Sequence, residues 1–288
     1  MANTSITIYP QYNSNQVKVI NCGTSSPRLG GTIDLSYYPN LNNFRCNSND
    51  ITHLSGYENN SNLQNLQFYD NKISGNLPSL SAMTSLVEIL FHQNLFTGSI
   101  PSLNGLTNLA TLFCFGNQFT GNIPELNNLP NFITLHCASN ILTGNIPSLS
   151  GAPNLINLYI NGNQLTGPIP SLSNNTNLIR IYCGNNLLTG NIPNFSGLNN
   201  FLEFRCETNQ LTGFAGGSVS INFGTFVANS NLLPSSAVNG ILAAFVAANK
   251  TTGTRILNLG GSGNAAPTGQ GITDKATLIS RGWTVTTN

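Results

Sequence analysis

The sequence predicts a solenoid of about ten coils, with a parallel β-sheet on its concave face, a β-hairpin cap at the N-terminus and a helix-strand-helix-strand cap at the C-terminus. Three observations predict this architecture. Asparagine, glycine and proline recur with a period of 23 residues along most of the chain. Apolar residues keep a fixed phase between these markers, and both ends of the chain depart from the pattern. A sustained period of this size is typical of a repeat architecture.

The N-terminal end contains two apolar segments separated by a polar one. "ITIYP" at 6–10 and "VKVIN" at 17–21 flank "QYNSNQ". This pattern favours a hairpin that covers the apolar end of the first coil. We therefore expect a cap arm over residues 1–16 and the solenoid over residues 17–233.

Each coil follows the pattern LxxLxLxxNxLTGxIPxLxxLxN. Side chains alternate within LxxLxL, so we expect a short strand there, and strands of neighbouring coils stack about 4.8 Å apart in a parallel sheet. The Thr-Gly and Ile-Pro elements then turn the chain back, because glycine permits tight backbone and proline needs no hydrogen-bond acceptor. A single coil cannot bury its own apolar face and depends on its neighbours.

One asparagine follows the strand in each coil. Its amide donates and accepts hydrogen bonds at once, so it can satisfy backbone groups that the chain would otherwise bury unpaired. We expect these residues to form a structural ladder along the solenoid. Its members are Asn49, Asn71, Asn94, Asn117, Asn140, Asn163, Asn186, Asn209 and Asn231.

This unit resembles that of the leucine-rich-repeat family, and its LTGxIP half is similar to the plant-type, extracellular subclass. The resemblance covers roughly residues 17 to 233. It implies a leucine-rich-repeat solenoid, and solenoids commonly use the concave sheet for recognition.

The segment 234–288 has a different character. "PSSAVNGILAAFVAANK" places Val238, Ile241 and Phe245 at helical spacing. "TRILNL" predicts a strand, "TDKATLISRG" a helix capped by Thr273 and ended by Gly282, and "WTVTTN" a closing strand. From "LTGFAGGS" onward, the chain also resembles the closing segment of leucine-rich-repeat proteins encoded by bacteriophages and some bacteria.

Composition favours a polar, nearly uncharged surface. Only 7% of residues are charged, 40% are hydrophobic, and the net charge is +1. This balance argues against nucleic acid as a partner, and no apolar run is long enough for membrane insertion. The N-terminus "MANTSITIYP" shows no secretory signal. With the phage resemblance, this favours a virion surface protein made in the host cytoplasm, and the alternative location is the extracellular space or a cell surface.

Six cysteines occupy the same inward position of the repeat: Cys22, Cys46, Cys114, Cys137, Cys183 and Cys206. They fall in adjacent coils, so three disulfides are one interpretation. Side chains in register on parallel strands point the same way, whereas a disulfide needs converging Cβ vectors. Buried thiols that act as small hydrophobes are therefore the preferred interpretation. The spacing fits no zinc site, and we expect neither metal nor cofactor.

The chain offers few groups for catalysis. Glu88, Glu203, Glu207, His92 and His136 belong to the predicted sheet face. The two histidines are two coils apart, about 10 Å along the sheet. An acid and a base that converge on a substrate are missing, so we expect no enzyme.

The outward positions of the strands gather aromatic and basic side chains, and we expect them to bind a ligand or partner. The candidates are Tyr69, Leu90, His92, Phe113, Phe115, His136, Tyr159, Arg180, Tyr182 and Arg205. One interpretation is cross-strand stacking that only stabilises the sheet. Another is recognition, with other virion or surface proteins, host protein or host glycan as partner. A purely architectural virion subunit and a bacterial cell-surface adhesin remain alternatives.

Overall fold

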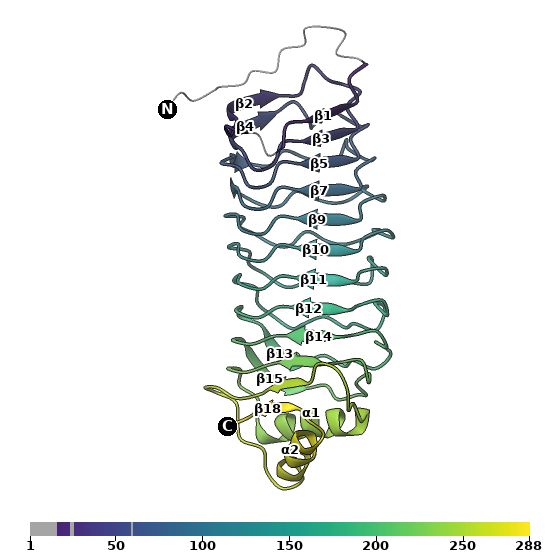
Figure 1. The fold of residues 1–288 in the computed structure, drawn as a ribbon, viewed down its shortest axis with the longest axis vertical. Helices are drawn as coiled ribbons and strands as arrows, with labels where there is room; N and C mark the ends of the chain where they lie inside the picture. Colours follow the sequence, from purple (N-terminus) through teal and green to yellow (C-terminus); the bar gives the residue numbers. More distant parts are fainter. Residues whose placement is uncertain (1–15, 24–25, 59) are drawn as a thin grey trace. The chain divides into compact units, whose positions relative to one another are not determined.

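The structure, a computed structural model, describes residues 16–23, 26–58 and 60–288 (Figure 1). The chain divides into two compact units, Met1–Leu142 and Thr143–Asn288, and each is described separately. The predicted strand at 6–10 and nearly all of the predicted cap arm lie outside the described residues.

In the first unit, one three-residue strand per coil joins a parallel sheet. The strands, in sheet order, are β1 (Val19–Asn21), β3 (Asn43–Arg45), β5 (Asn65–Gln67), β7 (Glu88–Leu90), β9 (Thr111–Phe113) and β10 (Thr134–His136). Each strand pairs with the next in register, so that Leu66 lies beside Ile89 and Ile89 beside Leu112. The central side chain of each of these three strands is buried, which places the core behind the sheet.

The second unit repeats this arrangement and adds the cap. Its sheet runs β11 (Asn157–Tyr159), β12 (Arg180–Tyr182), β14 (Glu203–Arg205), β16 (Thr225–Val227), β17 (Ile256–Asn258) and β18 (Thr284–Thr286). Helices α1 (Ser235–Ala248) and α2 (Gln270–Ser280) belong to the closing segment (Figure 1). The predicted solenoid and its helix-strand-helix-strand cap are confirmed, and the number of coils is close to the ten expected.

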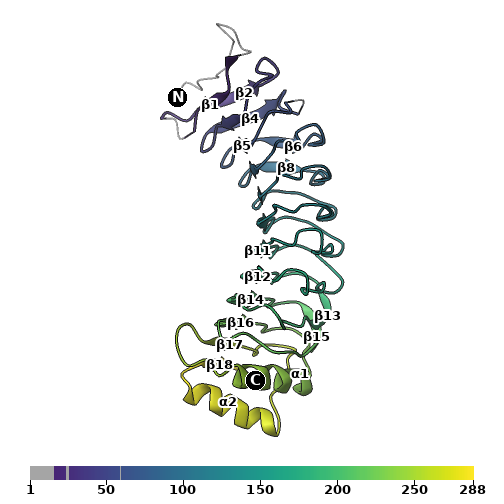
Figure 2. The same cartoon turned by 90° about the vertical axis from the view of Figure 1, so that its right-hand side faces the viewer.

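A second set of short strands lies in segments that we expected to be turns. The pairs are β2 (Gly30–Asp34) with β4 (Asp50–Ser55), β6 (Ser74–Asn76) with β8 (Leu95–Thr97), and β13 (Thr189–Ile192) with β15 (Gln210–Phe214). In Figure 2, β13 and β15 lie on the opposite side of the coils from β12 and β14. Glycine permits this path, since Gly98 has φ +70° and an added Cβ would lie 2.5 Å from the side-chain oxygen of Asn76.

The cap closes the second unit with aromatic packing. Phe245 of α1 contacts Phe223, Phe226 and Trp283, with ring centroids 5.2, 5.4 and 5.2 Å away. Trp283 is buried, as is the central residue of β17, Leu257. These contacts cover the apolar end of the last coil.

One detail of the predicted cap is wrong. Helix α2 begins at Gln270, and Thr273 lies inside it instead of capping it. The first turn is set earlier because the carbonyls of Thr268 and Gly269 accept hydrogen bonds from the backbone amides of Gly271 and Ile272. Gly282, with φ +81°, follows the end of the helix as predicted.

No disulfide joins the six cysteines, all of which lie in the described part of the chain. Five are buried and Cys22, in the first coil, is half-buried. The preferred interpretation of the inward position therefore agrees with the structure, with Cys22 as a more accessible member.

Candidate functional site

Four aromatic rings form a stack on the outward face of the first unit, which we call the aromatic ladder: Tyr69, His92, Phe115 and His136. Successive ring centroids lie 4.5, 4.4 and 4.1 Å apart, with planes inclined by 9°, 17° and 24°. His136 ends β10 and pairs in the sheet with Phe113, yet its ring stacks on Phe115. The ring faces therefore pack against each other, and the ring edges are exposed to solvent.

Phe113 lies beside the ladder without joining the stack. Its ring is inclined by 62° to His92 and by 76° to His136, at 6.0 and 5.5 Å. Leu90 pairs with Phe113 in the sheet. Both side chains are half-buried, as are the four rings of the ladder. The six candidates of the first unit therefore form one continuous half-exposed surface.

The two histidines of the ladder are neutral at physiological pH. Burial lowers the pKa of His92 to about 4, against an opposing effect of the Asp70 charge. Burial lowers the pKa of His136 to about 4 as well, and His92 adds to the effect. Nδ1 of His92 is buried and has no hydrogen-bond partner within the described residues. The ladder is thus an uncharged surface, with a Phe115 ring between its two imidazoles.

In the second unit, the candidates gather around a carboxylate, and we call Arg180, Tyr182, Glu203 and Arg205 the Glu203 cluster. The guanidinium Nε of Arg205 lies 2.6 Å from one carboxylate oxygen. The Tyr182 hydroxyl donates to the other oxygen, and Nε of Arg180 lies 3.8 Å from it. Tyr159 packs edge-on against Tyr182, with ring centroids 4.9 Å apart.

Glu203 raises the pKa values of two candidate residues, Tyr182 and Arg205. Sequence reasoning placed Glu203 on this face but did not identify it as their partner. Burial and the hydrogen bond to Glu203 raise the pKa of Tyr182 to about 12. Burial lowers the pKa of Arg205, but the hydrogen bond and charge of Glu203 outweigh it and raise the value overall. The charge of Arg205 is thus largely neutralised inside the cluster.

The side chains of the asparagine ladder form hydrogen bonds with the backbone. Nδ2 of Asn117 donates to the carbonyls of Phe91 and Cys114, both at 3.1 Å, and its Oδ1 accepts from the amide of Phe96 at 3.1 Å. Asn49, Asn71, Asn94, Asn140, Asn186, Asn209 and Asn231 make the same three kinds of contact. Asn163 donates to the carbonyl of Ile160.

The sequence period missed one such residue. Asn264, in the cap, donates to the carbonyls of Ala228 and Leu259 and accepts from the amide of Leu233. It lies 33 positions after Asn231 because helix α1 intervenes. Alignment of "NLGGSGN" with the strand-to-asparagine spacing could have found it.

Neither a protein-family model nor a curated protein sequence matches the chain. Solved structures do match. The Arabidopsis receptor kinase HAESA, solved with the peptide hormone IDA and the co-receptor SERK1, is 25% identical at a TM-score of 0.71, over 85% of this chain and 42% of that one. A Leptospira interrogans leucine-rich-repeat protein is 16% identical at a TM-score of 0.62, over 94% and 72% of the two chains. This chain is a leucine-rich-repeat solenoid.

A third match is the plant peptide hormone receptor RGFR1 in complex with RGF2, 21% identical at a TM-score of 0.61. It covers 85% of this chain and 45% of that one. The leucine-rich-repeat chain described here thus spans less than half the length of the plant receptor chains that it matches.

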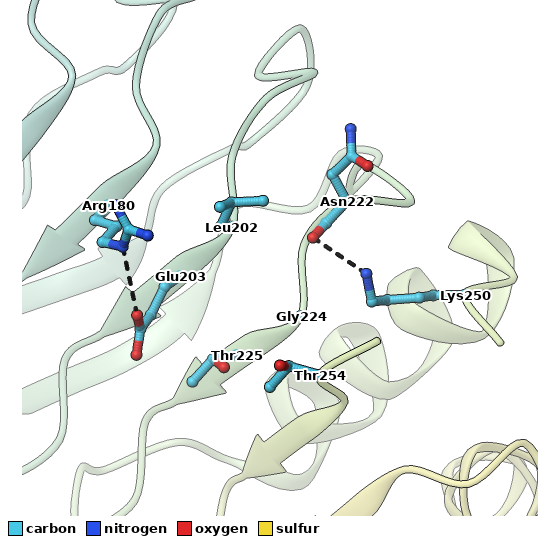
Figure 3. A pocket seen from close by; sticks show the side chains of 8 residues that line it. All are labelled: Arg180, Leu202, Glu203, Asn222, Gly224, Thr225, Lys250 and Thr254. Atoms are coloured by element: carbon cyan, nitrogen blue, oxygen red, sulfur yellow. Dashed lines mark hydrogen bonds and ion pairs between the residues drawn. The ribbon is translucent and has the colours of Figure 1, made fainter. Parts of the chain in front are cut away.

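The leucine-rich-repeat coils of the second unit also carry a cavity of about 250 Å³ beside the starts of β14 and β16 (Figure 3). It is lined by Arg180, Leu202, Glu203, Asn222, Gly224, Thr225, Lys250 and Thr254. Within residues 16–23, 26–58 and 60–288, no three His, Cys, Asp or Glu side chains are grouped to hold a metal ion. In the same part of the chain, neither helix has the length and apolar character needed to cross a membrane.

Proposed function

We propose that this leucine-rich-repeat chain is a non-enzymatic recognition module that binds a protein partner through the outward face of its sheet. The aromatic ladder of the first unit carries the proposal, because it presents a half-exposed, uncharged surface along successive strands. Two of the matched structures, those of HAESA and RGFR1, are described as complexes with peptides or peptide hormones.

The geometry of the ladder favours a peptide over a stacked sugar. Sugar rings bind aromatic faces, and here the faces of His92 and Phe115 are occupied by neighbouring rings. Ring edges carry the positive side of the aromatic quadrupole, which attracts carbonyl oxygens. An extended backbone, with a carbonyl at every residue, suits such a surface.

We place this recognition at the surface of a virion, with a cell surface as the alternative. The likeness of the closing segment to phage and bacterial leucine-rich-repeat proteins supports the proposal. So does the lack of a disulfide among the six described cysteines, which suits assembly in a reducing compartment. Electron microscopy with an antibody against the chain tests it. Label on particles supports the virion, and label only on cells supports the alternative.

A purely architectural role is the second candidate. The stacking within the ladder favours it, since cross-strand aromatic pairs stabilise a sheet by about 0.2 to 1 kcal/mol each without any partner. The two candidates differ in whether the ring edges bind anything.

A displayed library of random peptides, selected on the full chain, separates the two. We expect peptides whose affinity falls about 30-fold in Phe113→Ser, the scale of a 2 kcal/mol hot spot. Phe113 is the best choice because it stands outside the stack. Ile141→Ser is the matched control, since Ile141 is an exposed apolar residue of the same unit outside the ladder strands.

Equal affinity of the parent and Phe113→Ser would contradict binding by this face. If no peptide is enriched, and Phe113→Ser only lowers the free energy of unfolding, the architectural role is the correct one.

A further inference from the structure

The cavity in the second unit brings together polar groups from the starts of β12, β14 and β16 and from the segment between α1 and β17. Figure 3 shows Arg180 and Glu203 on one wall, Thr225 and Thr254 next to each other, and Lys250 reaching in from beyond α1. Gly224 is required for this arrangement. An added Cβ there would lie 2.5 Å from the Thr254 carbonyl oxygen, so glycine lets β16 approach the loop that precedes β17.

Several hydrogen-bond donors in this cavity have no partner. Arg180 makes one ion-pair contact, from Nε to Glu203, and its two terminal nitrogens donate to nothing in the described residues. The hydroxyl groups of Thr225 and Thr254 likewise make no hydrogen bond within the described part of the chain, although Thr225 is only 6% exposed. Arg180 and Thr254 reach solvent, so these donors can bind a ligand in place of water.

The ammonium group of Lys250 has one N–H group that forms no hydrogen bond within the described residues. Its ammonium donates to the carbonyls of Ile221 at 3.1 Å and Asn222 at 3.3 Å. An ammonium has three N–H groups. Burial, and then the charge of Arg255, lower the pKa of Lys250.

The cavity has an excess of positive charge. Glu203 is the only acidic residue that lines it, and that carboxylate is already paired with Arg205 at 2.6 Å. Arg180 shares this one carboxylate with Arg205, at 3.8 Å, and Lys250 donates only to carbonyl groups, so the cations outnumber the carboxylate. The whole second unit has the same bias, with six Lys or Arg residues against three Asp or Glu residues in 143–288. A ligand for this cavity is therefore an anion.

The donors select the kind of anion. A phosphate is commonly held by free backbone amides, but those of Gly224 and Thr225 already donate to the Leu202 carbonyl at 3.0 and 3.1 Å. The planar fork of Arg180 matches a planar carboxylate. The two hydroxyls of Thr225 and Thr254 suit a ligand with several hydroxyl groups.

We propose that this cavity binds the carboxylate-bearing ring of an acidic sugar. Arg180 binds the carboxylate, Thr225 and Thr254 exchange hydrogen bonds with ring hydroxyls, and Lys250 contributes charge and its third N–H. Leu202, 38% exposed at the rim, contacts the C–H face of the ring. This glycan site is independent of the peptide-binding face proposed above.

Calorimetry with galacturonate and galactose tests the site, because these sugars differ only in the carboxylate. We expect saturable binding of galacturonate and at least tenfold weaker binding of galactose. Arg180→Gln and, separately, Lys250→Gln should each weaken galacturonate binding at least tenfold, and Thr225→Val about threefold. Lys72→Gln, the same charge change in the first unit, should have no effect.

Three outcomes overturn the proposal. Equal binding of both sugars, or of neither, excludes carboxylate recognition here. Equal binding of acetate shows a general anion site. Tighter binding of an N-acetylated amino acid assigns the cavity to a peptide carboxylate. If Arg180→Gln disturbs the Glu203 cluster, Lys250→Gln still tests the site, because Lys250 does not belong to that cluster. None of these results affects the peptide-binding assay on Phe113.

Discussion

At the scale of single residues, Asn117 shows how the coils close their backbone. Its amide satisfies two carbonyls and one backbone amide that belong to two successive coils. Asn117 is only 8% exposed, so water cannot replace these contacts. The contribution of the asparagine ladder to the free energy of unfolding can therefore be measured by mutation.

Replacing Asn117 by Ala should lower the free energy of unfolding by about 1 to 3 kcal/mol, because buried backbone groups lose their partners. Denaturant unfolding followed by circular dichroism measures the change. Asn122→Ala, at an exposed turn of the same unit, is the control and should leave the value unchanged. A parent-like midpoint for Asn117→Ala would show that the asparagine is dispensable.

The histidines of the aromatic ladder predict a dependence of stability on pH. Their pKa values in the folded chain, about 4, lie below the usual 6.5, so the unfolded chain binds protons first as pH falls. The stability is fully present above pH 6.5 and is lost progressively toward pH 4. Thermal unfolding at several pH values measures this.

The matched variant carries His92→Phe together with His136→Phe. It keeps rings in the ladder but removes both titrating groups, so its melting temperature should fall less between pH 6.5 and pH 4 than that of the parent. Identical pH profiles would place the acid sensitivity elsewhere in the chain.

At the scale of elements, the six cysteines each follow a strand of the sheet, but Cys22 differs from the other five in its exposure. Cys22 follows β1, is half-buried, and has a pKa lowered chiefly by a hydrogen bond from the thiol of Cys46, whose own pKa is raised. Burial raises the pKa of Cys114, Cys183 and Cys206. Reactivity follows the thiolate and its exposure.

A maleimide should therefore label Cys22 first in the native chain, and all six cysteines after denaturation without reductant. Peptide mapping by mass spectrometry identifies the labelled residue. In Cys22→Ser, the rapid native labelling should disappear. Labelling of Cys183 or Cys206 at the same rate would mean that the core opens to solvent.

Helix α1 makes a prediction about the cap. Phe245→Ala removes a buried ring that contacts Phe223, Phe226 and Trp283, and it should destabilise the cap by about 3 to 5 kcal/mol. Trp283 is the only tryptophan of the chain, so its fluorescence reports on this element. We expect its emission to shift to longer wavelength at a lower denaturant concentration than in the parent.

Far-UV circular dichroism, recorded alongside, follows the coils as well. If the tryptophan signal of Phe245→Ala still changes where that of the parent does, the ring contacts contribute little to the cap. Ile279→Ala, at an exposed position of α2, is the control.

At the scale of the whole molecule, the periodic part was predictable and the surface chemistry was not. The sequence period predicted the sheet strands and their order because each coil buries the same apolar positions against its neighbours. The second set of strands, β2, β4, β6, β8, β13 and β15, was missed because these strands are short and coincide with the Thr-Gly turn segments of the repeat. The role of Glu203 depends on side-chain directions. The cavity combines the starts of three strands with the segment after α1, so neither feature has a sequence signature.

Equivalence of the coils predicts that whole repeats can be removed. Deleting residues 166–188 joins Leu165 to Thr189 and replaces one coil by the next in the same phase. We expect a folded chain with a circular-dichroism spectrum like that of the parent. Deleting 166–185, which removes 20 residues, shifts the apolar phase and should give an unfolded or aggregated product. Folding of both variants would mean that phase does not matter.

The hydrogen bonds of the sheet join residues about one coil apart, as the amide of Glu88 donates to the carbonyl of Gln64. Such contacts form with little loop closure, so each coil can dock as soon as the ribosome releases it. The cap, in contrast, is synthesised after the coils. Until α1 emerges, the nascent chain ends in uncovered phenylalanines such as Phe223 and Phe226. Premature termination before residue 234 should therefore yield a product that chaperones retain and proteases remove, which makes the cap a checkpoint on synthesis of the coils.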